Sequence, residues 1–406
     1  EFLFRSENKN FLIKDINFIY NQNKKKLIQG SAYLNKLSSK IDYSVKSKDF
    51  KNYDIFIKQQ LNSNQELIEW KLNLTNENKI KLYGNVFGDL IDLEKIDFSS
   101  HFNFNKGQFR HSFVNSSFQN KLDINLSFLF KKLKYKDFLL KDLNFLIRGN
   151  ENLLKVKNFK SKLNESDFFL EAYVDISNLK LKGFGSVKNY EIPISLYGKT
   201  KFDLHGGKTK LDFDFSKKNL NFGKKIFDDL FFKAKLNVEK PILVGIDLNQ
   251  AFSRIKNISD ISSLFNVLEI KNLNGTSKLI FIRSDFELSS KKLKISNLQV
   301  KDTNIKLNGS GTFDLNKNFL KMENFLFITD KQFSKLPSIP IKINGPLNKL
   351  SYKYDIENFK NVLISKGLNL ILRKNQKIII DPAQIIDDFN KNDNDELKNI
   401  LQELFR

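Results

Sequence analysis

Apolar and polar residues alternate along most of this chain. In the clearest stretch every second residue is apolar or glycine: Ile305, Leu307, Gly309, Gly311, Phe313 and Leu315. The residues between them are polar: Lys306, Asn308, Ser310, Thr312 and Asp314. Because successive side chains of a β-strand point to opposite faces, this alternation predicts a strand with one apolar face and one solvated face.

The same pattern recurs in roughly twenty segments between residues 11 and 356. A second clear example places apolar residues at Leu122, Ile124, Leu126, Phe128 and Phe130. The connections are mostly short, which favours antiparallel meanders because a parallel crossover needs a dozen or more residues. About twenty strands at ~4.8 Å spacing would extend over ~100 Å, and an open sheet of that length has to twist or curl. We therefore predict a mainly β protein with a long, curled, mostly antiparallel, repetitive sheet.

Helical periodicity is present in two places. Apolar residues recur at spacings of three and four between Asp247 and Leu268, and again in the C-terminal segment that ends with Leu397, Ile400, Leu401, Leu404 and Phe405. The predicted organisation is a repetitive β-sheet region over 1–240, a helical insertion over 241–270, a second β region over 271–356 and a helical tail over 357–406.

The charge of the chain is strongly basic. Lys and Arg number 68 against 46 Asp and Glu, a formal net charge of +22. The lysines are spread over the polar side of nearly every predicted strand and are mixed with acidic residues. This distribution is typical of a solvated face rather than a nucleic-acid groove, so we expect no nucleic-acid partner. Proximity to anionic lipid headgroups is a third interpretation.

The sequence contains no pattern that predicts catalysis. It has no cysteine, which excludes disulfides and thiolate chemistry. The three histidines (His101, His111 and His205) are not spaced as metal ligands. Neither a phosphate-binding glycine loop nor a nucleophile elbow is present, and the carboxylate pair Asp212 and Asp214 fits the solvated face of a strand. We expect no enzyme, no metal and no cofactor.

The apolar positions form the largest unexplained feature. In a sandwich or closed barrel, two such faces would bury each other. In a sheet curled into a trough, the apolar face would stay open to apolar ligands. Both arrangements require the same alternation, so periodicity does not separate them.

Four segments between residues 275 and 347, taken in their order along the sequence, resemble the C-terminal region of the AsmA family of bacterial envelope proteins. They are Gly275–Leu279, Leu293–Val300, Asn308–Leu315 and Ile339–Leu347. Segments nearer the start resemble the N-terminal β-region and internal repeat of that family: Phe11–Phe18, Gly30–Leu34, Tyr83–Val86 and Lys141–Gly149.

The resemblance implies an elongated, curled sheet with an apolar groove, similar to bridge-like lipid transporters. It also implies an inner-membrane anchor upstream of Glu1, a periplasmic location, and a role in outer-membrane biogenesis. That role is carrying phospholipid between the inner and outer membranes or influencing outer-membrane protein assembly. The groove residues expected to contact acyl chains are Leu122, Ile124, Leu126, Leu170, Val174, Leu181, Leu307 and Phe313. The alternative is a periplasmic scaffold with a closed core that binds an envelope protein through its helical tail at 397–405.

Overall fold

The structure is a computed structural model, and it describes six main ranges of the chain. These are residues 2–92, 122–192, 203–218, 229–255, 275–330 and 337–354, with short gaps at 7–8, 23–26, 35–38, 48, 62–65, 136–137, 151, 246 and 348. Almost all of the described residues lie in β-strands, as the alternation predicts. The chain divides into two compact units, residues 1–190 with 211–232 and residues 191–210 with 233–406.

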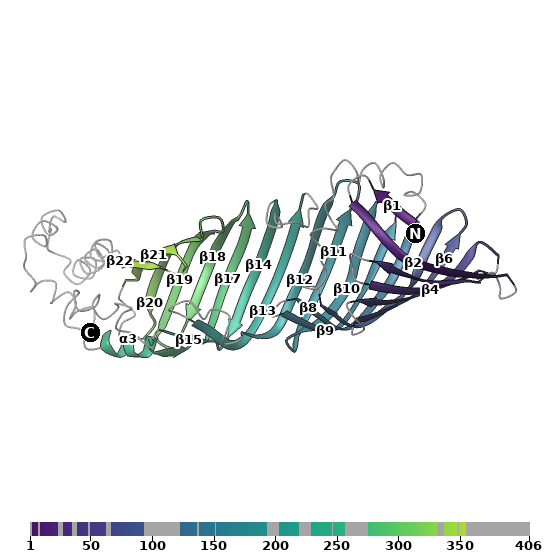
Figure 1. The fold of residues 1–406 in the computed structure, drawn as a ribbon. Coiled ribbons are helices and arrows are strands. Elements are labelled where there is room, and N and C mark those ends of the chain that lie inside the picture. Colours follow the sequence, from purple (N-terminus) through teal and green to yellow (C-terminus); the bar gives the residue numbers. More distant parts are fainter. Residues whose placement is uncertain are drawn as a thin grey trace, which may run out of the picture. The chain divides into compact units, whose positions relative to one another are not determined.

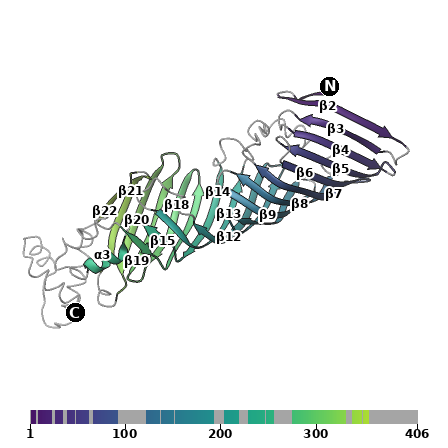
Figure 2. The same cartoon turned by 60° about the horizontal axis from the view of Figure 1, so that its bottom comes forward.

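The first unit is built on a series of hydrogen-bonded strands that follow one another in the sequence (Figures 1 and 2). They are β1 (Phe2–Ser6), β2 (Lys9–Asn21), β3 (Leu27–Leu34), β4 (Ser39–Ser47), β5 (Asn52–Leu61), β6 (Glu66–Asn76), β7 (Ile80–Asp92), β8 (Leu122–Tyr135), β9 (Phe138–Asn150), β10 (Leu153–Leu163), β11 (Ser166–Asp175) and β12 (Lys180–Ile192). This unit also contains residues 211–217 of β13 (Asp203–Lys217) and 230–232 of β14 (Leu230–Glu239).

The first unit contains one parallel strand pair among its described antiparallel ladders. The described ladders from β1 to β7 and from β8 to β12 are antiparallel, as expected for short turns. Strands β7 and β8 pair in parallel, for example Leu82 with Ile124. The sheet is mostly antiparallel and open, which confirms the predicted class and pairing.

Irregular positions in neighbouring strands preserve the apolar face where strict alternation fails. The pairing of β7 with β8 is interrupted at Asp89 and Lys131, with the same register on both sides of the interruption. In β9, Asp142 has φ of 52°, and in β10, Asn158 has φ of 54° beside a register shift. An extra residue of this kind moves the following side chains to the other face. On β7, Val86 and Ile91 are both buried although they differ in parity.

The second unit contains a longer antiparallel sheet and a small three-stranded one. The longer sheet pairs β17 (Phe281–Ser289), β18 (Lys292–Lys301), β19 (Ile305–Asp314), β20 (Phe319–Ile328), β21 (Ile339–Pro346) and β22 (Ser351–Tyr354) in sequence order. The small sheet pairs the start of β13 with β15 (Ile242–Val244), and β15 with β16 (Thr276–Lys278).

The predicted helical insertion over 241–270 is wrong at its beginning, because residues 242–244 form strand β15. The described helix, α3 (Leu248–Ile255), is only eight residues long. Asp247 caps it by accepting a hydrogen bond from the Gln250 backbone N–H at 2.9 Å, and the Leu248 N–H donates to Ser277 Oγ at 2.8 Å. The remainder of the insertion and the predicted tail at 357–406 lie outside the described residues.

The turn between β11 and β12 provides a pH-dependent contact. The Asp175 carboxylate accepts hydrogen bonds from Asn178 Nδ2 at 2.8 Å and from Ser177 Oγ at 2.6 Å. These side-chain hydrogen bonds, that from Asn178 first, lower the pKa of Asp175 from 3.8 to about 2. Since the pKa is lowered by folding, the contribution of this turn to stability is complete above pH 3.8 and is lost as the pH falls through about 2.

We expect Asp175 to titrate near pH 2 in an NMR experiment that follows its carboxyl carbon. Asp175→Asn should remove the corresponding part of the pH dependence of stability in acid. An Asp175 pKa close to 3.8 would contradict the hydrogen-bonded turn.

Candidate functional site

One face of the sheet in the first unit carries continuous rows of apolar side chains, and we call it the first apolar face. One row of paired residues crosses from β7 to β12: Leu82, Ile124, Gly149, Leu154, Val174 and Leu181. The adjacent row consists of Gly84, Leu126, Ile147, Val156, Ala172 and Gly183. These rows place residues far apart in the sequence side by side on a common surface.

Six of the eight predicted groove residues share the first apolar face. Ile124, Val174 and Leu181 lie in the first row and Leu126 lies in the second. Leu122 pairs with Ile80, and Leu170 pairs with Phe159 and Gly185. Leu126 is 8% exposed and the other five are half-buried.

A continuous series of aromatic rings crosses this face. The aromatic lane consists of Trp70, Phe128, Phe145, Phe159, Phe168, Phe213 and Phe232. Successive ring centroids are 6.2, 4.7, 5.2, 5.7, 6.5 and 5.9 Å apart. These separations lie within the range of favourable edge-to-face and offset-stacked contacts. The lane joins β6, β8, β9, β10, β11, β13 and β14.

Small residues on intervening strands give the rings their room. Trp70 on β6 and Phe128 on β8 meet edge to face although β7 lies between their strands. The β7 residue in that row is Val86, which is fully buried. On β12, a Cβ atom at Gly185 would lie 2.6 Å from the Phe213 ring, so that ring lies directly over the glycine. The lane therefore depends on the small size of the residues at these intervening positions, Val86 and Gly185.

The exposure of the lane differs from that of an ordinary core. All seven rings are half-buried. Four of the rings, those of Trp70, Phe128, Phe145 and Phe159, pack against a buried cluster that consists of Leu61, Ile68, Val86, Ile91, Phe130 and Leu143. In the described part of the first unit there is no helix that could cover the face. The lane is thus an ordered aromatic surface that retains contact area for an apolar molecule.

None of the seven rings of the aromatic lane was among the predicted groove residues. Phe159 follows the irregular residue Asn158, so its side chain does not share the parity of Val156 although both face the same side. The signal that could have placed Phe159 on this face is the positive-φ tendency of Asn next to an apolar run, whereas Phe145 alternates regularly with Ile147.

In the second unit, Leu307 and Phe313 lie on the same face of β19. Leu307 pairs with Val300 and Leu326, and Phe313 pairs with Leu293 and Leu320. Both predicted residues are half-buried. The structure therefore places them together in this unit and the other six candidates together in the first unit.

The apolar face of the second unit contains a buried amide that the alternation does not explain. Asn324 is 1% exposed, and its Nδ2 donates to the Ile341 carbonyl at 3.4 Å. Its Oδ1 occupies the space above Gly309, which has no side chain. The glycine on this strand thus accommodates a neighbouring side chain.

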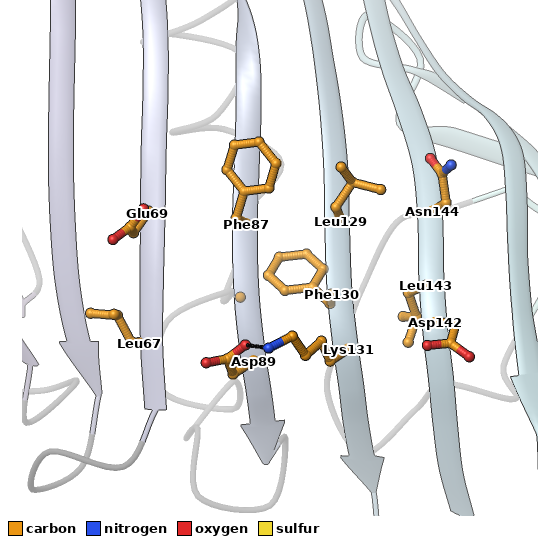
Figure 3. A pocket seen from close by; sticks show the side chains of 11 residues that line it. Leu67, Glu69, Phe87, Asp89, Leu129, Phe130, Lys131, Asp142, Leu143 and Asn144 are labelled. Carbon is orange, nitrogen blue, oxygen red and sulfur yellow. Dashed lines mark ion pairs between the residues drawn. The ribbon is translucent and has the colours of Figure 1, made fainter.

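The opposite face of the first unit carries an open hollow of about 600 Å³ (Figure 3). Its apolar floor includes Phe87 and Leu129, which pair across β7 and β8. Lys131 Nζ and Asp89 Oδ1 form an ion pair of 2.7 Å at the rim, and this contact raises the pKa of Lys131. Both side chains are largely exposed, so water screens the pair and it is a surface feature that adds little to stability.

Polar residues that could support chemistry are scattered in the described ranges. His205 lies on β13 and pairs with Ile242, while His101 and His111 lie outside the described residues. Within the described ranges no group of three or more His, Asp or Glu side chains could hold a metal ion. No helix in the same ranges has the length and hydropathy required to cross a bilayer.

No protein-family model, curated protein or solved structure shows a significant match to this chain. The functional interpretation therefore rests on the geometry of the apolar faces and on the sequence resemblance described above.

Proposed function

We propose that this chain is a non-enzymatic lipid carrier whose apolar β-face holds phospholipid acyl chains. The observation that supports this function best is the aromatic lane, because seven half-buried rings form a continuous apolar path across the strands of one unit. An acyl chain lying along the lane would contact one ring after another while its headgroup remained in water.

The energetics suit a carrier. Each methylene removed from water contributes ~0.8 kcal/mol, so a two-chain lipid gains substantial binding energy without a charged or catalytic group. The lane offers similar contacts from strand to strand. A bound acyl chain therefore has nearly the same energy at neighbouring positions along the lane. A lipid can therefore be held and still move along the face.

The resemblance to the AsmA family supplies the cellular setting of the proposal. In that setting the chain is periplasmic, is linked to the inner membrane, and carries phospholipid toward the outer membrane through an open, curled groove. The predicted residues from Leu122 to Leu181 would contact acyl chains in the first unit, and Leu307 and Phe313 would do so in the second.

Native mass spectrometry of protein purified from cells, combined with lipid extraction, tests the proposal. We expect co-purified phospholipid, and we expect Ile124→Asp to lower the amount bound by about tenfold or more because a carboxylate would face the acyl chains. The matched control is Leu129→Asp, which lies on the same strand and points to the opposite face at 38% exposure.

The control should retain its lipid. A folded, lipid-free wild-type protein would rule out the carrier function, as would an equal loss of lipid from both variants. Circular dichroism of each variant separates loss of lipid from loss of fold.

A further inference from the structure

Two neighbouring phenylalanines project from the second unit on the side away from its apolar face. Phe325 is 43% exposed and Phe327 is 37% exposed. They alternate on β20 with the buried residues Asn324 and Leu326, so their rings lie on the opposite side of the sheet. Single exposed aromatic residues are common, but two at adjacent positions of one face form a local apolar patch.

Lysines surround these rings on the same face. Lys306 on β19 pairs directly with Phe327, and Lys301 on β18 pairs with Lys306. Farther along the face, Lys321 lies on β20, and Lys342 on β21 pairs with Glu323. We define the phenylalanine–lysine patch as Phe325, Phe327, Lys301, Lys306, Lys321 and Lys342.

The charge of the patch limits the kind of partner that fits. The patch has four lysines, with the carboxylate of Glu323 between them and that of Asp314 at its edge. The excess of positive charge favours an anionic surface, and the exposed rings favour one with an apolar layer beneath its charges. An anionic lipid bilayer combines both, since its phosphates lie directly above the acyl region.

We propose that the phenylalanine–lysine patch docks the protein on a membrane surface that contains anionic phospholipids. Phe325 and Phe327 enter the boundary between headgroups and acyl chains, and the lysines contact the phosphates. This docking site lies on the opposite side of the sheet from the apolar face of the same unit. It does not depend on whether that face carries lipid.

Vesicle flotation with the chain described here tests the docking site. We expect binding to vesicles of phosphatidylglycerol and phosphatidylcholine, weaker binding to phosphatidylcholine alone, and a decrease as salt rises from about 0.1 M to 1 M. The double variant Phe325→Ser/Phe327→Ser should bind about tenfold or more weakly. Lys306→Gln should bind about fivefold more weakly because one lysine near the lipid surface is lost.

Phe184→Ser is the matched control. Phe184 is 41% exposed on β12 of the first unit, and its paired residue is Glu171 rather than a lysine. This variant should bind vesicles as the wild type does. Equal loss of binding in Phe184→Ser, binding indifferent to phosphatidylglycerol, or no binding of the wild type would overturn the proposal.

The groove variant Ile124→Asp distinguishes docking from lipid carriage. It should lose co-purified lipid and still bind anionic vesicles. If it lost vesicle binding as strongly as the Phe325/Phe327 double variant, the first apolar face would be the membrane contact and the patch would not.

Discussion

Leu143→Ala is expected to lower the free energy of unfolding of the first unit by about 2–5 kcal/mol, the range for truncating a buried leucine. Leu143 is 1% exposed and pairs with Phe130 in the fully buried cluster of the first unit. Removal of its isobutyl group leaves a cavity there. Urea unfolding followed by the fluorescence of Trp70, whose ring packs against the same cluster, measures the effect.

The matched control for this substitution is Leu129→Ala. Leu129 is next to Phe130 on β8, but its side chain points to the other face and is 38% exposed. Its truncation should change the unfolding free energy by less than about 1 kcal/mol. If the two variants were equally stable, the burial of Leu143 could not be the source of stability in this region.

Gly183→Ala is expected to destabilise the same unit by about 3 kcal/mol, at the upper end of the range for overpacking. A methyl group at this position would overlap the backbone carbonyl of Glu171 on the paired strand β11. It would also lie 2.6 Å from the Phe215 ring. The carbonyl group cannot move away without distorting the sheet, because it belongs to the backbone of β11.

Gly149→Ala separates a rigid obstacle from a flexible one. Gly149 is also buried on the first apolar face, but a methyl group there would meet mainly the end of the Leu154 side chain. Rotation of that side chain can relieve the contact, so we expect a loss of only about 1 kcal/mol. Thermal unfolding of both variants measures the difference, and a larger effect at Gly149 than at Gly183 would contradict this account.

The glycines of the first apolar face connect stability with the proposed function. Gly185 leaves room for Phe213 in the same way that Gly183 leaves room for Phe215. The rings can then lie close to the sheet and form a shallow apolar floor. A larger residue at Gly185 would lift Phe213 away from Phe168, with which it stacks at 6.5 Å, and would interrupt the aromatic lane.

The β-strands themselves were predictable because alternation is a local property. The run at 122–130 and the run at 305–314 each fall on a strand whose apolar residues share one face, as the pattern indicates. The helical insertion was predicted less well. Residues 242–244 are too few to show a periodicity of their own, and pairing with β13 and β16 makes them a strand.

The parallel pairing of β7 with β8 was not predicted. Both strands alternate as antiparallel strands do, so their sequences contain no sign of direction. The 29 residues between them provide the length that a parallel connection requires. The number of residues between the two strands was therefore the available signal, and it was outweighed by the many short turns elsewhere.

By itself the sequence determined that this protein is mainly β, that each strand has one apolar face, and which residues of a run share that face. Only the tertiary structure decided that the rings from Trp70 to Phe232 form a continuous lane and that Leu143, rather than its neighbours, is fully buried. The physical reason is that alternation arises within a single strand. Ring contacts arise between strands and depend on register, irregular residues such as Asn158, and small residues on the strands between them.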